Sequence, residues 1–234
     1  LLASFGLVMV YSASIATAEG SAFTGHQPAY FLIRHTVFLL VGFLTALIAF
    51  QIPLRFWQQF APWLFLGGVL LLAIVLVPGI GKSVNGARRW VHIGPINFQA
   101  VEAVKLMFIV WLSSYLVRYR DQIGVSIKAL LKPIGIAGAL VALLLIQPDF
   151  GSSALILAIT LCMIWLGGAN QKHIIGPAIG IIVAMAGIAW MEPYRVKRLT
   201  TFLDPWADQF DSGFQLVQAF IAIGRGGFSG VGLG

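Results

Sequence analysis

Long runs of apolar residues, separated by short polar segments, form the main pattern of this chain. Runs of about 17–25 apolar residues are long enough to cross a bilayer as helices. The pattern predicts seven such spans, at Leu1–Ala18, Tyr30–Gln51, Phe60–Val77, Phe98–Val117, Pro133–Ile146, Gly151–Gly168 and Ile174–Met191. We therefore expect an all-α protein, a polytopic transmembrane helix bundle.

The fifth predicted span is short, and Gln147, Pro148 and Asp149 separate it from the sixth. Two interpretations remain open at this point. The two segments are separate spans, or together they form one hairpin whose turn dips into the membrane. Asp149 lies directly before the sixth span, where aspartate is a favoured helix N-cap.

The chain becomes polar after Met191. Residues 192–234 contain one short amphipathic stretch, Phe214–Ile223, which Ser212 is placed to cap and the following glycines are placed to end. We expect two regions, the membrane helices of 1–191 and the first part of a large extracytoplasmic loop at 192–234. Because the chain begins inside an apolar run and stops among glycines, we also expect it to be a fragment.

Composition supports a membrane protein and excludes several other classes. Hydrophobic residues make up 59% of the chain and charged residues 10%, with a mean hydropathy of +0.92; soluble domains carry about 25% charged residues. The single cysteine, Cys162, permits no internal disulfide. The basic residues are spread among loops rather than along one face, so we do not expect nucleic acid binding.

The charges of the loops favour one orientation only weakly. One side carries six basic residues against one acid, a net charge of +5, and the other carries eight against six, a net charge of +2. Lys and Arg counts alone do not decide the orientation. By net charge, the first side is the cytoplasmic one.

Glu102 and Lys105 stand inside a predicted span. They are three residues apart and share one helix face. A charge near the centre of a membrane helix costs about 2.5–3.5 kcal/mol, so such residues usually have a partner, a water-filled cavity or a function. A structural ion pair remains the alternative to a binding role.

A glycine-rich basic segment, GKSVNGARRW at 81–90, precedes that helix. Arginine grips phosphate with two parallel hydrogen bonds, so Arg88 and Arg89 suit a lipid phosphate or diphosphate as well as ordinary anionic headgroups. Arg195 is a further candidate contact. If Glu102, Lys105 and Asp149 meet, they form a polar pocket with Arg88 and Arg89 above it. The histidines show no metal-ligand spacing.

Taken together, the motifs resemble the SEDS family, the shape, elongation, division and sporulation proteins of bacteria. The resemblance rests on VMVYSAS (8–14), KSVNGARRWVHIG (82–94), NFQAVEAVK (97–105), LLLIQPDFGS (143–152), EPYRVKRLTTFLDPWADQ (192–209) and GFQLVQAFIAIGRGGFSGVGLG (213–234). DPWADQ and GFQLVQ are more similar to the cell-division branch, FtsW, than to the elongation branch, RodA.

The resemblance implies a bundle of about ten membrane helices, of which about seven lie in this chain. It implies a cytoplasmic amino terminus and a peptidoglycan glycosyltransferase of the bacterial cytoplasmic (inner) membrane that polymerises lipid II at the division septum. Implied partners are a class B penicillin-binding protein of the FtsI type, regulators of the FtsQ, FtsB and FtsL type, and membrane lipids.

The resemblance also assigns roles to residues. Arg89, Glu102, Lys105 and Asp149 fall on polar positions of the family's central cavity, and Arg88 and Arg195 are further diphosphate contacts. The family's catalytic aspartate falls beyond Gly234. The family usually has proline where Ala100 stands here. No cofactor is implied with certainty, although a divalent cation could assist at the diphosphate. A lipid II transporter and a non-catalytic scaffold of the division complex remain alternatives.

Overall fold

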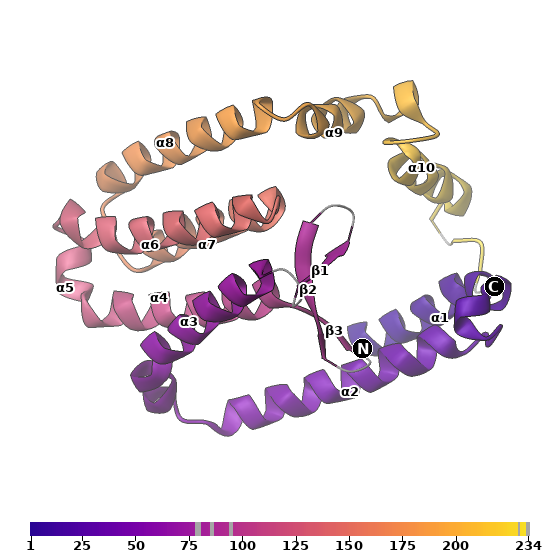
Figure 1. Ribbon diagram of the computed structural model, residues 1–234, viewed down its shortest axis with the longest axis horizontal. Coiled ribbons are helices and arrows are strands. Elements are labelled where there is room, and N and C mark those ends of the chain that lie inside the picture. The colour runs from indigo at the N-terminus through magenta and orange to yellow at the C-terminus, as the bar shows by residue number, and fades with distance from the viewer. Residues whose placement is uncertain (78–80, 85–86, 94–95, 229, 233–234) are drawn as a thin grey trace. The chain divides into compact units, whose positions relative to one another are not determined.

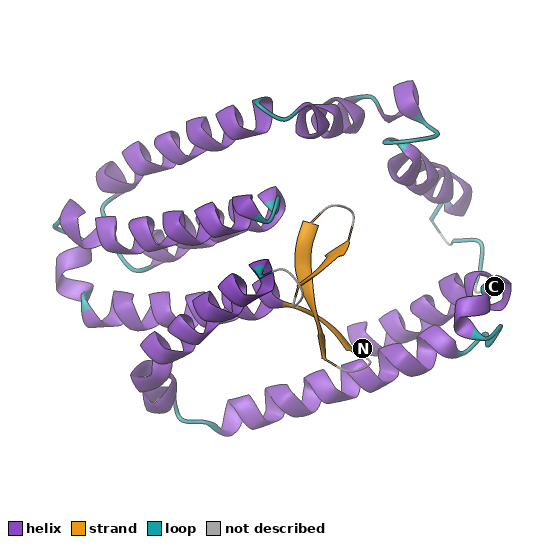
Figure 2. Ribbon diagram, in the orientation of Figure 1, coloured by secondary structure: helices purple, strands orange, loops and turns teal. Residues whose placement is uncertain are grey.

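The computed structural model describes residues 1–77, 81–84, 87–93, 96–228 and 230–232 (Figures 1 and 2). Its α-helices are α1 (Leu2–Gly20), α2 (Tyr30–Gln51), α3 (Leu54–Leu76), α4 (Ala100–Arg118), α5 (Arg120–Ile123), α6 (Ile127–Ile146), α7 (Phe150–Leu166), α8 (Gln171–Trp190), α9 (Pro193–Leu203) and α10 (Phe214–Gly226). Short 3₁₀ helices are η1 (Ala22–Thr24) and η2 (Pro205–Asp208), and the strands are β1 (Gly81–Val84), β2 (Ala87–Ile93) and β3 (Ile96–Gln99).

The predicted helical membrane bundle is confirmed. Six of the described helices are long and apolar enough to cross a membrane, namely α1, α2, α3, α4, α6 and α8. The seventh predicted span is α7, which at 17 residues is shorter. The chain is therefore a multi-pass membrane protein.

The short fifth span is a prediction that the structure corrects. Helix α6 begins at Ile127 rather than at Pro133 and has 20 residues, enough to cross by itself. It takes in Lys128 and Lys132, whose long side chains can reach the membrane surface from a helix end. Helices α6 and α7 lie side by side as a hairpin joined at Gln147–Asp149 (Figure 1).

The all-α prediction omitted a small sheet. The segment interpreted as a basic loop forms two of three antiparallel strands, in the order β1-β2-β3, and β3 leads directly into α4 (Figure 2). The strands occupy residues between two membrane helices, so the fold remains that of a helical bundle.

Contacts divide the chain into two units, Pro53–Met191 and Leu1–Ile52 with Glu192–Gly234. In the first unit, α4 is the central helix. It packs closely on α3 and also contacts α7. Its side chains Val104, Phe108 and Leu112 are fully buried, and they form one hydrophobic core with residues of α3, α6 and α7. The core fixes the position of α4, and with it that of Glu102 and Lys105.

Two prolines lie inside helices that flank α4. A proline has no N–H, so it leaves the carbonyl four residues earlier without its helical donor. Pro62 in α3 frees the carbonyl of Gln58, which accepts a hydrogen bond from Ser114 Oγ at 3.2 Å. Pro133 in α6 frees the carbonyl of Ala129, which accepts from the Tyr115 hydroxyl at 2.8 Å. Neighbouring residues of α4 thus satisfy both carbonyls.

In the second unit, α1 and α2 pack as a pair, and both α9 and α10 contact η2. The prediction that Ser212 caps the amphipathic helix is wrong. The N-cap of α10 is Gly213, with no side-chain cap, because the Ser212 hydroxyl donates to Asp208 Oδ2 at 2.7 Å instead. The helix continues through Gly224 and Gly226 and ends at Gly227, which has a φ of +52°. The division at residues 191 and 192 stays a prediction.

Candidate functional site

A β-bulge in β2 positions Arg89. Trp90 pairs with Lys82 and Arg88 pairs with Ser83, so Arg89 is the extra residue without a partner on β1. The pairing of β2 with β3 begins only at Trp90. A bulge bends the strand and re-aims a side chain, and bulges occur often beside functional sites.

The start of the sheet lies close against α3. A Cβ atom at Gly81 would overlap the carbonyl oxygen of Val75, so only glycine allows this approach. The strand β1, which pairs with the strand that carries Arg89, therefore packs directly against the end of the core helix α3.

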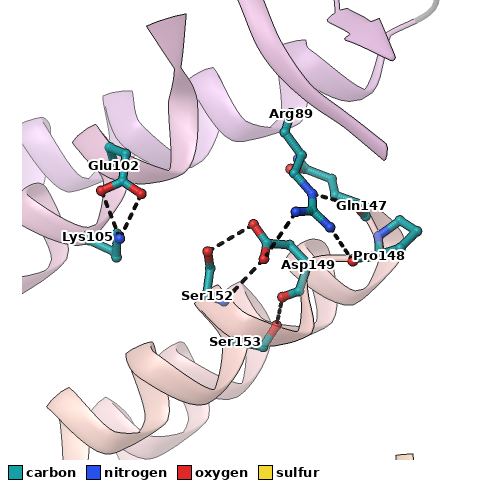
Figure 3. Close-up of polar contacts among 8 residues, drawn as sticks. All are labelled: Arg89, Glu102, Lys105, Gln147, Pro148, Asp149, Ser152 and Ser153. Atoms are coloured by element: carbon teal, nitrogen blue, oxygen red, sulfur yellow. Dashed lines mark hydrogen bonds and ion pairs between the residues drawn. The ribbon is translucent and has the colours of Figure 1, made fainter. Parts of the chain in front are cut away.

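The Arg89 guanidinium points to the turn between α6 and α7 (Figure 3). Its Nε donates to the carbonyl of Gln147 at 3.4 Å, and Nη2 donates to the carbonyl of Pro148. Nη1 lies 3.8 Å from Asp149 Oδ1. The arginine side chain is 30% exposed, whereas that of Asp149 is only 7% exposed. Three groups thus orient a guanidinium that remains accessible on one side.

Asp149 is the N-cap of α7, as the sequence predicted. Its Oδ1 accepts from the Ser152 backbone N–H at 3.2 Å, and its Oδ2 accepts from the Ser152 hydroxyl at 2.9 Å. The Ser153 hydroxyl donates to the Asp149 carbonyl at 2.7 Å. The two Ser152 donors, together with Arg89 and the positive end of α7, compensate the burial of the carboxylate.

Gln147 connects this turn to α3. Its side chain is buried, and Nε2 donates to the carbonyl of Leu72 at 3.1 Å. Leu72 lies in the last turns of α3, so this bond joins the turn to the end of a core helix. Sequence reasoning did not identify Gln147 or Ser152 as site residues. The QPDFGS motif contains both, but only the fold shows which atoms they meet.

Glu102 and Lys105 form the ion pair that their spacing predicted. Both oxygens of Glu102 lie 2.8 Å from Lys105 Nζ (Figure 3). The Lys105 side chain is 16% exposed and that of Glu102 is 57% exposed. Ala100, at the position where the family usually has proline, is the first residue of α4, and Glu102 lies in the first turn. The acid therefore faces the positive end of the helix.

Four of the predicted site residues form two ion pairs. Arg89 pairs with Asp149 and Lys105 pairs with Glu102, and among the described residues no bond joins one pair to the other. A single pocket that contains both pairs stays a prediction. The side chains of Arg88 and Arg195 lie outside the described part of the structure. Arg195 belongs to α9, in the other unit.

Two aspartates of the 192–234 region, Asp208 and Asp211, have a structural role. Lys197 Nζ lies 2.8 Å from Asp208 Oδ2 and 3.0 Å from Asp211 Oδ2. Hydrogen bonds to these carboxylates raise the pKa of Lys197 to about 12, and the bond from Lys197 lowers the pKa of Asp208. These contacts tie α9 to η2 and to the turn before α10.

The fold and the site together define the class of the protein. It is a polytopic helical membrane protein with two ion pairs, and the central helix α4, the bulged strand β2 and the α6–α7 hairpin position these pairs. Comparison with known proteins then identifies the family. The chain belongs to the FtsW/RodA/SpoVE family of cell cycle proteins, whose family model matches residues 1–234. The resemblance to the SEDS family is confirmed.

Relatives with similar sequences support the division branch. The chain is 49% identical over 230 residues to the "Probable peptidoglycan glycosyltransferase FtsW" of Aromatoleum aromaticum, with 98% of this chain and 56% of the relative covered. It is 48% identical over 233 residues to the protein of the same name from Xanthomonas oryzae pv. oryzae, with 100% of this chain and 46% of the relative covered. The chain thus spans about half the length of the curated relatives that it matches.

Solved structures show the same fold. A chain of a structure described as "Structural coordination of polymerization and crosslinking by a peptidoglycan synthase complex" matches with a TM-score of 0.69 and 29% identity, over 96% of this chain and 66% of that one. The crystal structure of the Thermus thermophilus rod shape determining protein RodA matches with a TM-score of 0.60 and 26% identity, over 80% of this chain and 57% of that one.

Proposed function

We propose that the protein is a peptidoglycan glycosyltransferase that polymerises lipid II into glycan strands during septal cell-wall synthesis. The observation that carries this proposal is the near-complete match of the chain to relatives that are named as such enzymes. The two ion pairs support it, because they hold two cations, Arg89 and Lys105, where a diphosphate could bind.

The main demand of the reaction on the protein is to stabilise the negative charge of the departing diphosphate. An acceptor sugar hydroxyl attacks the anomeric carbon of the donor, a new C–O bond forms, and the bond to the lipid diphosphate breaks. The hydroxyl proton passes to a base, and the departing diphosphate takes the bonding electrons. Preorganised cations stabilise the charge that develops on the diphosphate.

Each of the predicted site residues has a role in this scheme. Arg89 and Lys105 bind the diphosphate, with Arg88 and Arg195 as further contacts. Glu102 orients the Lys105 ammonium, and Asp149 orients the Arg89 guanidinium. The base is an aspartate beyond Gly234. Asp208 and Asp211 are not candidates, since Lys197 already engages them.

A divalent cation acting at the diphosphate would depend on the substrate for most of its ligands. Across the described ranges, no three His, Cys, Asp or Glu side chains form a group that could hold a metal ion. Mg²⁺ often binds through substrate phosphates with one or two carboxylates. The roles assigned above do not depend on a bound metal ion.

The proposed setting is the bacterial cytoplasmic (inner) membrane at the division septum. A class B penicillin-binding protein of the FtsI type would crosslink the strands, and regulators of the FtsQ, FtsB and FtsL type would accompany both proteins. The similarity to a chain of a peptidoglycan synthase complex supports a crosslinking partner.

The test uses the protein at its natural length, purified with its crosslinking partner and supplied with labelled lipid II. We expect glycan strands from the unaltered protein and none from Glu102→Gln, with both proteins folded. If folded protein binds lipid II and forms no strands, translocation of the lipid in vesicles is measured next. Translocation without polymer would replace the enzyme by a transporter.

A further inference from the structure

A second polar site lies at the other end of α4. A cavity of about 160 Å³ is lined by Pro62, Trp111, Ser114, Tyr115, Arg118, Tyr119 and Lys132. All of these residues belong to the unit Pro53–Met191. Arg118 is the last residue of α4 and Glu102 is in its first turn, so about 24 Å of helix separates the two ends.

The walls of this cavity are held rigidly. Trp111 stacks on Phe65 with ring centroids 5.1 Å apart and on Tyr115 at 5.7 Å, and Tyr115 contacts Tyr119 at 4.6 Å. The hydroxyls of Ser114 and Tyr115 are already donated to the carbonyls that Pro62 and Pro133 leave free. These polar groups therefore shape the cavity rather than bind a ligand.

The charged groups that line the cavity are its two cations, Arg118 and Lys132. Among the described residues, no carboxylate forms an ion pair with Arg118 or Lys132. The Lys132 ammonium lies 5.7 Å from the centre of the Tyr115 ring, a cation–π contact that restrains it without neutralising its charge. Both side chains line the cavity while their residues stay exposed at its rim.

We propose that this cavity binds an anionic phosphate group between Arg118 and Lys132. A planar guanidinium and a restrained ammonium together suit the several oxygens of a phosphate. The phosphate belongs to an anionic lipid headgroup or to a free phosphate ion. This site lies at the opposite end of α4 from Arg89 and Lys105, so it is separate from the proposed diphosphate site and would exist whether or not the protein is a polymerase.

The experiment measures binding of dioleoylphosphatidylglycerol to the full natural-length protein by native mass spectrometry. The test variant is Arg118→Gln with Lys132→Gln. The matched control is Arg120→Gln with Lys128→Gln, which removes the same charge from nearby positions that do not line the cavity. We expect affinity to fall about tenfold or more in the test variant, because charge-assisted hydrogen bonds are lost, and less than about twofold in the control.

Inorganic phosphate at constant ionic strength distinguishes the two sources. Displacement of the lipid would show that the site accepts a bare phosphate, and its failure to displace would show that the site needs the headgroup attached to lipid. Equal weakening in the test and control variants, or no weakening in the test variant, would overturn the proposal.

The single variants Arg118→Gln and Lys132→Gln are measured alongside, and they carry the test if the double variant does not fold. Each is expected to bind about threefold to tenfold more weakly. Unchanged affinity in both would equally overturn the proposal. Because binding is measured without any polymer synthesis, the result is independent of the proposed activity.

Discussion

The two ends of α4 solve the burial of polar groups in different ways. At the end with Glu102 and Lys105, each described cation has a carboxylate partner: Lys105 pairs with Glu102, and Arg89 pairs with Asp149. At the other end, hydroxyls from α4 satisfy backbone carbonyls that prolines leave free, and no described carboxylate pairs with Arg118 or Lys132.

The polar contacts at the first end of α4 therefore fix the positions of charged groups, whereas those at the second end fix the walls of a cavity. A paired cation keeps its geometry before a ligand arrives, so less ordering remains to be done on binding. An unpaired cation near a preformed cavity has more of its charge available but is held less firmly. The first arrangement suits a reaction that needs fixed charges, and the second suits reversible binding.

The largest expected effect is on catalysis at the first end. Lys105→Met should lower the rate of strand synthesis by about 100-fold or more, since it removes a preorganised charge from the diphosphate. Stability should change by less than about 1 kcal/mol, because Glu102 is 57% exposed and such pairs contribute little. Strand synthesis from labelled lipid II and thermal unfolding in detergent are the two measurements.

The control for that variant is Lys128→Met, which removes an exposed lysine from the opposite end of the unit. It should leave the rate unchanged. Normal turnover in both Lys105→Met and Glu102→Gln would contradict the placement of the diphosphate site.

Variants of Asp149 test how much the carboxylate charge and the helix cap each contribute to stability at the first end of α4. Asp149→Ala removes the cap of α7 and the partner of Arg89, and it should lower the free energy of unfolding by about 2–3 kcal/mol. Asp149→Asn keeps an acceptor for the Ser152 N–H and should cost about half as much. The comparison is made by thermal unfolding, with Asp121→Ala as an exposed control. Equal losses for Ala and Asn would show that the cap contributes nothing.

The Tyr115 hydroxyl is the corresponding test at the second end. Tyr115→Phe leaves the Ala129 carbonyl without a donor and should cost about 1–2 kcal/mol of unfolding free energy. Pro133→Ala restores the backbone N–H that this carbonyl lacks. The double variant should therefore lose less stability than Tyr115→Phe alone. Strict additivity in the double-mutant cycle would disprove the link between Pro133 and Tyr115.

Ser114→Ala should have the smallest effect, about 0.5–1 kcal/mol. Its bond to the Gln58 carbonyl is longer, at 3.2 Å, and Gln58 is exposed, so another donor can replace the hydroxyl. The measurement is again thermal unfolding. If Ser114→Ala lowers the free energy of unfolding as much as Tyr115→Phe does, the Gln58 and Ala129 carbonyls depend equally on their hydroxyl donors, and this prediction is wrong.

The helices could be predicted from the sequence because long apolar runs follow directly from the bilayer as solvent. The start of α6 was missed because Lys128 and Lys132 broke the apolar pattern, although charged side chains are tolerated at a helix end. The sheet was missed because glycine and basic residues suggested a loop. The Asn85-Gly86 dipeptide between β1 and β2 is nonetheless a strong hairpin signal.

Contacts within one helix or one turn were predictable, and contacts across the chain were not. The spacing of Glu102 and Lys105 predicted their pair, and the place of Asp149 predicted its cap. The approach of Arg89 to Asp149 depends on a bulge and on a hairpin 58 residues further along the chain. No local pattern fixes that distance.

The two prolines also bear on the order in which the helices can assemble during synthesis. Helix α3 precedes α4 in the chain, so its Gln58 carbonyl has no Ser114 to meet when it first enters the membrane. Gln58 lies in the second turn of α3, close to the helix end. Helix α6 follows α4, so Tyr115 is already present when the Ala129 carbonyl arrives. In hydrocarbon, an unsatisfied backbone group costs several kcal/mol. The buried carbonyl is thus the one whose donor has been synthesised first.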